Sequence, residues 1–220
     1  MVPDATPRKD PARYEPIQWP TGERVQLSPR SAALNIDLVN LLEQRQTRRI
    51  FSRELSIDEI GDFLWLVCRS RSVRPSIYGP CQESRPHPSA GAMHPVHVFI
   101  APNALALHRY DSTEHALVEL PASATGACHI QRAAKKSLEL GMGHVLALVA
   151  EPGKTGAKYE NPDSLVLRDA GVVLGYMSIV AEALGLAFCP LGITGHPDLT
   201  LELPFPNALR AVGLAVIGKA

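Results

Sequence analysis

Lys158 and Tyr159 stand side by side in a stretch of the chain that is rich in glycine, proline and lysine. Both side chains titrate at about pH 10 when unperturbed, and they could act as general base and general acid in a site that lowers one of the two pKa values. A lysine and a tyrosine also occur together in loops without any catalytic role. The pair is therefore a candidate that needs support from the rest of the chain.

A loop of small residues occurs in the stretch RPHPSAGAMHPVHVFI, residues 85–100. Small side chains leave backbone N–H and C=O groups unshielded, so a flat ligand could lie against this backbone. The β-branched and aromatic residues that follow predict a strand over residues 96–101, which would give the loop a rigid base. A Pro/Gly turn that only leads into a strand is the alternative interpretation. The loop residues are Pro88, Ser89, Ala90, Gly91 and Ala92.

Arg45, Thr47 and Arg49 occupy alternating positions in the segment RQTRRIF. If the backbone is extended there, the three side chains point to one side and could hold one phosphate with two guanidinium groups and a hydroxyl. The alternative is a solvated basic face that follows a helix.

Three histidines, His87, His94 and His97, crowd the small-residue loop, and Cys81 lies nearby in the sequence. These residue types bind zinc, but His94 and His97 are three positions apart at the start of a strand and should face opposite sides. We therefore expect no metal site. Ser89 lacks the G-x-S-x-G elbow of a hydrolase, and Gly141-Met142-Gly143 lacks the context of a dinucleotide fingerprint.

Two amphipathic helices are predicted ahead of these loops. Leucines at positions 34, 38, 41 and 42 recur at helical spacing and predict a helix that ends near residues 44–47. Ser56 and Glu59 form a capping box, so a second helix should begin at Ile57 and end before the polar run of residues 69–86. Its predicted apolar face comprises Ile60, Phe63, Leu64, Val67 and Cys68.

Further along the chain, apolar runs of strand length alternate with helical, loop and turn patterns. They predict strands over residues 105–111, 116–120, 145–150, 187–189 and 211–218, and the continuous run 145–150 should be buried on both faces. Residues 129–140 have a helical pattern, 151–162 predict a loop, and Pro190-Leu191-Gly192 predicts a turn. Without strict βαβ alternation, the order of elements indicates an α+β or mixed α/β sandwich.

The longest apolar stretch covers residues 165–186, and its length raises the question of a membrane span. Arg168, Asp169 and Glu182 argue against that interpretation. A helix that is apolar nearly all round and ended by charges is typical of the central core helix of a globular protein.

The composition excludes some classes of partner. Lys plus Arg and Asp plus Glu each number 22 of the 220 residues, so no net charge attracts nucleic acid or an acidic membrane. The four cysteines are scattered and no apolar leader is present, so we expect a cytoplasmic protein with reduced thiols. The proline-rich residues 1–30 predict an extended arm, of the kind that often wraps a partner subunit, ahead of one domain over residues 31–220.

Taken in order, five segments resemble the nitroreductase-like flavoenzymes, and most closely their SagB/McbC-type branch of azoline dehydrogenases. The resemblance spans roughly residues 38–219. The first segment resembles an Arg-x-Ser-x-Arg opening followed by a capped helix, the second a P-S-A-G-A loop, and the third a Y-D-x-x-x-H-x-L hairpin. The fourth resembles a Lys-Tyr loop followed by a long helix and a Pro-Leu-Gly turn, and the fifth resembles the last strand. The segments are RQTRRIFSRELSIDEIGDFLW, RPHPSAGAMHP, RYDSTEHAL, KYENPDSLVLRDAGVVLGYMSIVAEALGLAFCPLG and AVGLAVIGK.

The resemblance implies a nitroreductase-like mixed sheet flanked by helices, a long buried central helix, and an intertwined homodimer with one FMN at each subunit interface. Residues of the basic segment would hold the phosphate and pyrimidine edge, the small-residue loop would line the isoalloxazine, and the Pro-Leu-Gly turn would pass behind N5. Lys219 would supply the basic residue that family members often carry beyond the last strand. The residues assigned to FMN are Arg45, Thr47, Arg49, Pro88, Ser89, Ala90, Gly91, Leu191, Gly192 and Lys219.

The resemblance also implies that Lys158 and Tyr159 are catalytic and take a proton while hydride leaves for flavin N5. The substrate would be a thiazoline or oxazoline, free or on a carrier or peptide, made upstream by cyclisation of Cys, Ser or Thr. A cyclodehydratase would then be a partner, and dioxygen would reoxidise the flavin.

Three functions stay open at this point. The first is an FMN-dependent dehydrogenase of the azoline type, favoured by Lys158-Tyr159 together with the P-S-A-G-A loop. The second is an NAD(P)H-dependent nitro or quinone reductase, whose loop more often offers an asparagine near Ala92. The third is a flavin-free scaffold or binding protein that keeps the fold.

Overall fold

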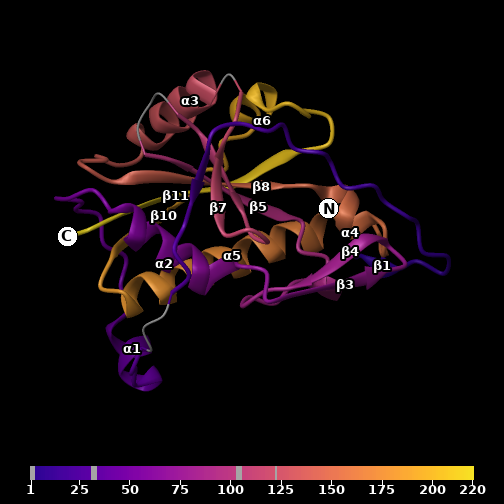
Figure 1. The fold of residues 1–220 in the computed structure, drawn as a ribbon, viewed down its shortest axis with the longest axis horizontal. Coiled ribbons are helices and arrows are strands. Elements are labelled where there is room, and N and C mark those ends of the chain that lie inside the picture. Colours follow the sequence, from indigo (N-terminus) through magenta and orange to yellow (C-terminus); the bar gives the residue numbers. More distant parts are fainter. Residues whose placement is uncertain (1–2, 31–33, 103–105, 122) are drawn as a thin grey trace.

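One antiparallel sheet forms the centre of the computed structural model, which describes residues 3–30, 34–102, 106–121 and 123–220 (Figure 1). Its strands are β2 (Arg24–Gln26), β5 (Val96–Ala101), β6 (His108–Asp111), β7 (Ala116–Glu119), β8 (His144–Ala150), β10 (Ala187–Leu191) and β11 (Arg210–Gly218). They lie in the order β10-β11-β8-β5-β6-β7-β2. The predicted α+β class is confirmed. Every pairing in this sheet is antiparallel, where a mixed sheet was predicted. Strand β5 pairs with β6, β6 pairs with β7 and β10 pairs with β11, and such neighbours along the chain run antiparallel.

Strand β8 occupies the predicted central position. It pairs with β11 on one side and with β5 on the other, and all seven of its residues are buried. Leu146 and Leu148 enter one hydrophobic core, and Val145 and Val149 enter the core on the opposite face. A strand with two buried faces needs apolar residues at every position, which explains the continuous run in the sequence.

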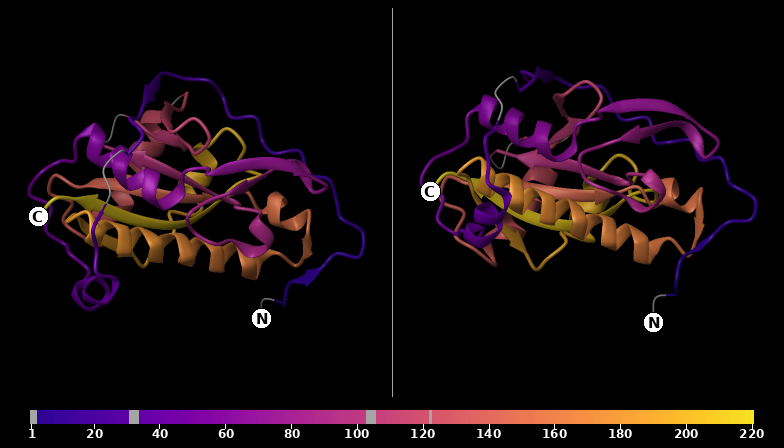
Figure 2. Two further views of the ribbon diagram at one scale, coloured as in Figure 1. Left: turned by 60° about the horizontal axis from the view of Figure 1, so that its bottom comes forward. Right: turned by 90° about the horizontal axis from the view of Figure 1, so that it is seen from below.

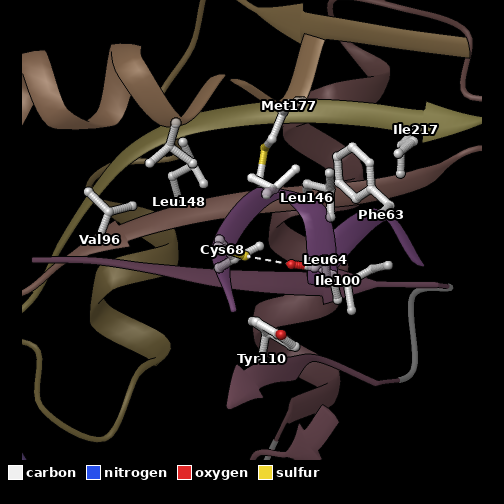
Figure 3. Close-up of a cluster of buried hydrophobic side chains, with 14 of the residues drawn as sticks. Phe63, Leu64, Cys68, Val96, Ile100, Tyr110, Leu146, Leu148, Met177 and Ile217 are labelled. Carbon is white, nitrogen blue, oxygen red and sulfur yellow. Dashed lines mark hydrogen bonds between the residues drawn. The ribbon is translucent and has the colours of Figure 1, made fainter. Parts of the chain in front are cut away.

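Helices cover both faces of the sheet. Helices α2 (Ile57–Cys68) and α5 (Asp163–Ala183) lie on one face, and α3 (Ser123–Lys135) and α6 (Asp198–Glu202) lie on the other (Figure 1). The core between the sheet and the first pair of helices is drawn in Figure 3, where Phe63, Met177 and Ile217 come from α2, α5 and β11.

Local capping decides where the first two helices begin. The Ser56 hydroxyl accepts a hydrogen bond from the Glu59 N–H, and the Glu59 carboxylate accepts one from the Ser56 N–H, so α2 begins as predicted. Its predicted apolar face is buried. Helix α1 (Leu38–Gln44) begins later than the leucine spacing predicted, because the Asp37 carboxylate accepts the Val39 and Asn40 N–H groups and caps the helix there.

Helix α5 is long and lies across one face of the sheet, but only one of its sides is buried. The buried residues recur at three- or four-residue spacing, whereas Leu167, Gly171 and Gly175 on the other side are exposed. By length and composition alone α5 could also cross a membrane. Its single buried stripe is that of a helix packed on a sheet, so α5 is central but half-buried rather than buried all round.

Three further predictions about the elements are wrong. Helix α3 covers Ser123–Lys135 instead of 129–140, because small residues such as Ala127 and Ala134 form its buried side and give a weak apolar signal. The predicted loop 151–162 contains helix α4 (Pro152–Gly156), which has proline at its first position, and strand β9 (Tyr159–Glu160). Pro190 and Leu191 belong to β10, where they pair with β11, rather than to a turn.

A polar hairpin forms a separate two-stranded sheet. Strands β3 (Ser72–Ser76) and β4 (Gly79–Ser84) pair with each other, and no apolar alternation predicted them because β3 is largely exposed. The predicted strand 105–111 corresponds to β6, and its predicted start at residue 105 lies outside the described residues.

The N-terminal segment is extended, as predicted, but it packs against its own chain. Strand β1 (Thr6–Pro7) pairs with β9, and β2 joins the edge of the main sheet beside β7. Leu27 is only 1% exposed, so the prediction of an unpacked arm is wrong there. The reason is that Val25 and Leu27 alternate with polar residues and present one apolar side to the core.

Candidate active site

The small-residue loop forms a tight turn that is bonded to α5. Residues Ala90–Ala92 form a 3₁₀ turn in which Gly91 has a left-handed φ of 61°. Asp169 of α5 accepts hydrogen bonds from Ser89 Oγ (2.6 Å) and from the Ala90 N–H (3.0 Å). The His94 N–H donates to Ser89 Oγ (2.9 Å). The loop is therefore held at both ends, and the Ser89 hydroxyl is used within the chain.

The sequence predicted no role for Asp169 beyond that of a charge that argues against a membrane span. It is 5% exposed, and its burial raises the pKa of its carboxyl group above the ordinary value, although the bonds from Ser89 and Ala90 oppose that shift. An acidic residue inside an otherwise apolar helix was the available signal, because a buried carboxylate needs hydrogen-bond donors.

Lys158 and Tyr159 lie against this loop. A Cβ atom added to Gly91 would stand 2.9 Å from Lys158 Nζ and 2.8 Å from Tyr159 Oη. Both functional atoms thus converge on the loop residue that has no side chain. Lys158 Nζ also lies 5.2 Å from the centre of the Tyr78 ring, whose face attracts an ammonium group.

The N-terminal segment is hydrogen-bonded to the backbone around Lys158 and Tyr159. The Arg8 N–H donates to Lys158 O (2.9 Å), the Ala12 N–H donates to Ala157 O (2.9 Å), and β1 pairs with β9 at Tyr159. Farther along, the Ile17 N–H donates to Glu151 Oε1 (2.8 Å). We call residues 6–17 the N-terminal strap. The sequence predicted an extended arm but not its position over residues 151–160.

The basic segment lies at the other end of α5. Arg48 has a structural role. Its guanidinium pairs with Glu182, and its backbone N–H donates a hydrogen bond to Phe188 O. Arg45 and Arg49, with Thr47 between them, form no ion pair with the described residues. Burial raises the pKa of the Cys189 thiol, and the neighbouring Arg49 guanidinium opposes that shift.

Lys219 lies near the start of β10 and near the basic segment. Lys219 follows Gly218, which is opposite Ala187 at the start of β10, and its Nζ donates to Glu59 Oε1 (3.0 Å). Lys219 is therefore paired with an acid within the chain. Leu191 ends β10, and Gly192 follows it with open space where a Cβ would stand.

The residues predicted to hold a flavin thus form two groups in one chain. One group, around Gly91 and the Lys158-Tyr159 pair, is anchored at Asp169, and the other is anchored through Arg48 at Glu182. Thirteen positions of α5 separate these two anchors, which is about 20 Å along a helix. Figure 2 shows α1 and the C-terminus near one end of α5 and the N-terminal segment near the other.

The histidines near the loop do not gather into one cluster. The His87 and His94 rings contact each other with centres 5.1 Å apart, and burial lowers their pKa values to about 4 and about 3. His97 Nε2 lies instead 2.9 Å from Glu151 Oε2. Among the residues that the structure describes, no group of three or more His, Cys, Asp or Glu side chains is placed to hold a metal ion.

The fold is of the α+β class, with one antiparallel sheet covered by helices on both faces. A sequence model of the nitroreductase family matches residues 42–219, so the chain belongs to the nitroreductase family. Members of this family are FMN-dependent oxidoreductases. A search of curated proteins found no match.

Several solved structures share this fold at low sequence identity. A candidate nitroreductase from Ralstonia eutropha JMP134 is 16% identical, with a TM-score of 0.67 over 96% of this chain and 97% of that chain. A chain of the E. coli microcin synthetase McbBCD complex with truncated pro-MccB17 bound is 20% identical, with a TM-score of 0.61 over 86% of this chain and 75% of that chain. At these identities the likeness establishes the fold.

Proposed function

We propose that this chain is an FMN-dependent dehydrogenase of the SagB/McbC type, which oxidises a thiazoline, an oxazoline or a related heterocycle in a biosynthetic pathway. The observation that carries the proposal is the convergence of Lys158 Nζ and Tyr159 Oη on Gly91. A proton acceptor held beside the predicted ring-binding loop is what the oxidation of such a heterocycle requires. The likeness to a chain of a microcin synthetase complex with a bound peptide is consistent with this choice.

The chain fits FMN at two points. Arg45 and Arg49 form no ion pair with the described residues, and with Thr47 they would hold the phosphate and pyrimidine edge. The backbone of Ser89 to Gly91, after Pro88, would line the ring, and Gly91 leaves room there for the Lys158 and Tyr159 side chains. Leu191 and Gly192 would lie behind N5. When bound, FMN accepts a hydride at N5.

The protein residues would supply the proton chemistry and the positioning. As the substrate C–H bond gives up its electron pair as hydride, Lys158 or Tyr159 would take the proton that the ring loses, so that the product is the aromatic azole. The Tyr78 ring holds the lysine from one side, and the N-terminal strap holds the backbone of both residues. Asp169 keeps the loop against α5.

A homodimer would complete this site. The exposed side of α5 carries Leu167, Gly171 and Gly175, and α1 adds Leu38 and Leu42, which are 61% and 51% exposed. A second copy packed with its α5 antiparallel would place the basic segment of one chain near the loop of the other. One flavin would then contact both chains. We also propose a cytoplasmic location, a carrier-bound or peptide substrate, and a cyclodehydratase as upstream partner.

The first test uses the visible absorption of the purified protein. We expect added FMN to bind and its oxidised bands to bleach anaerobically when a methyl thiazoline-4-carboxylate is added. Bleaching by NADPH alone would instead favour the nitro or quinone reductase, and a protein that binds no FMN would exclude both enzymes.

The second test replaces the proposed proton acceptor. Lys158→Ala should retain FMN and lose about 10²-fold or more of the bleaching rate, because general acid–base groups contribute that much. Lys135→Ala, on the exposed side of α3, is the matched control and should be unaffected. An unchanged rate in Lys158→Ala would exclude Lys158 from the chemistry.

A further inference from the structure

A separate cavity of about 350 Å³ lies beneath the second half of the N-terminal strap and the residues that follow it. Its walls come from residues 16–19, from β4, β5 and β6, and from α4. Gln18, Cys81 and Thr113 are exposed at its rim, so the cavity opens to solvent. None of the residues assigned above to FMN or to proton transfer lines it.

The carboxylates around this cavity are already engaged. Glu83 accepts hydrogen bonds from Arg85 Nε (2.9 Å) and Ser112 Oγ (3.1 Å). Asp111 accepts from Arg109 (3.2 Å) and from backbone N–H groups of its own turn. Glu151 accepts from the Ile17 N–H and lies 2.9 Å from His97. Each acid therefore has partners within the described part of the chain.

Three nitrogen donors at the same cavity have no such partner. Trp19 Nε1 and Arg109 Nε are buried without a hydrogen bond to the described residues. Lys154 Nζ interacts with Arg85, Glu83 and Glu151 only through longer-range electrostatics and forms no hydrogen bond with the described residues. A buried donor that stays unpaired lowers the stability of the folded chain. We therefore expect these donors to bind a hydrogen-bond acceptor.

These donors are held in fixed positions. The Trp19 ring packs edge-on against His97 and Phe99, with centres 5.1 and 5.6 Å apart. The Arg109 guanidinium lies 5.3 Å from the centre of the Trp19 ring and is tied to Asp111. The side chain of Arg109 is 12% exposed. An acceptor group would therefore meet preorganised donors, which lowers the entropic cost of binding.

The rest of the wall contains both polar and apolar residues. Ile17, Val98 and Tyr110 line the cavity beside the donors. We infer that this cavity binds a small monocarboxylate, whose carboxylate group accepts hydrogen bonds from Lys154, Arg109 and Trp19 and whose short hydrocarbon chain lies against Ile17, Val98 and Tyr110. The proposal does not rest on the function proposed above, because the residues of this cavity are separate from those assigned to the flavin.

Two sources could supply that carboxylate. One is a free acid that binds here alone, and the other is the carboxylate end of a molecule that also reaches the flavin loop. A narrow second cavity shares Pro16, Cys81 and Lys154 with the first and extends to Ala92 and Met93 of that loop. Both sources use the same chemistry at Lys154.

The test titrates the FMN-treated full chain with butyrate and with butyramide, its uncharged analogue of the same shape. The readout is Trp19 fluorescence in a Trp65→Phe background, which leaves one tryptophan at the cavity wall. We expect saturable binding of butyrate and about tenfold or weaker binding of butyramide, because bonds to a charged acceptor are the stronger. A shift of the flavin bands by butyrate would indicate the source that reaches the loop, and unchanged bands would indicate a free acid.

Variants at Lys154 complete the test. Lys154→Met should weaken butyrate binding about tenfold or more, whereas Lys154→Arg and the surface control Lys135→Met should retain it. The proposal would be overturned if butyrate and butyramide bound equally or if butyrate did not bind. If Lys154→Met failed to fold, the comparison of the two ligands on the unmodified chain would still decide.

Discussion

Some residues of the predicted motifs are bonded to other side chains of the chain, and others remain candidates to bind a ligand. Ser89 and Arg48 lie within the predicted motifs, yet Asp169 and Glu182 engage their side chains. Arg49 is different, because its guanidinium forms no ion pair with the described residues and lies beside the Cys189 thiol. Partners already present in the chain thus separate structural residues from candidate ligands within one motif.

Arg49→Ala should weaken FMN binding about 10- to 100-fold, which corresponds to the loss of a hydrogen bond to a charged group. The measurement is a fluorescence titration of FMN. Arg132→Ala, an exposed arginine on α3, is the matched control. Full FMN affinity in Arg49→Ala would remove this residue from the phosphate site.

The acid that holds Lys219 should make stability depend on pH. The hydrogen bond from Arg53, together with bonds from Ser56 and Lys219, lowers the pKa of Glu59 to about 2, against an ordinary value near 4.5. Ionised Glu59 therefore stabilises the folded chain above about pH 4.5, and this stabilisation is lost as the pH falls toward 2. Glu59→Gln should lower the urea midpoint at pH 7 and much less at pH 2.5. An equal loss at both pH values would contradict this assignment.

Among the elements, the N-terminal strap is the one whose role the sequence least predicted. Its residues hold the backbone of residues 156–160 through β1, Arg8 and Ala12, while Tyr14 packs on Gly153, where an added Cβ would lie 2.2 Å from its ring. The Lys158-Tyr159 pair thus depends on a segment far away in the sequence. Loops near a site are usually mobile unless such contacts order them.

Removal of residues 1–12 should loosen the Lys158-Tyr159 backbone without unfolding the chain, because the core clusters lie elsewhere. We expect hydrogen exchange at residues 156–160 to rise about tenfold or more, with FMN content unchanged. Exchange in β8 provides the internal control. Unchanged protection at residues 156–160 would show that the strap does not order this segment.

On the scale of the whole molecule, the two groups of predicted flavin residues lie at opposite ends of α5. A site built from one chain would have to span the distance between Asp169 and Glu182, whereas a two-fold dimer would bring the groups together. The exposed apolar residues of α1 and the bare side of α5 are the surface that such a dimer would cover.

Mixing two variants that each lack one residue of the proposed site tests this arrangement. In a dimer of Arg49→Ala with Lys158→Ala, one shared site loses both residues and the other retains both. After random exchange of subunits, about one site in four should be intact, and about a quarter of the bleaching rate should return. Light scattering of the unmodified chain checks the dimer itself. No recovery in a mixture shown to exchange subunits would place both residues in a site made by a single chain.

Local patterns in the sequence determined several elements of this protein. The capping box at Ser56 began α2, and the continuous apolar run of β8 marked a strand buried on both faces. The capping box depends only on residues a few positions apart, and a strand that is buried on both faces needs apolar residues at every position. The α+β class followed from the order of such elements. The small-residue loop and the Lys-Tyr pair were also visible as residue types and spacings.

Only the tertiary structure decided how these parts meet. Gly91 and Lys158 come together because β5, β8 and α4 fold back on one another, and no local pattern encodes that contact. Asp169, the strap and the cavity at Lys154 depend on side chains from distant segments that become partners only after packing. Helix α3 was misplaced for the related reason that its small buried residues carry little local signal. Burial and partner choice are properties of the folded chain, and they determine which residues are free to act.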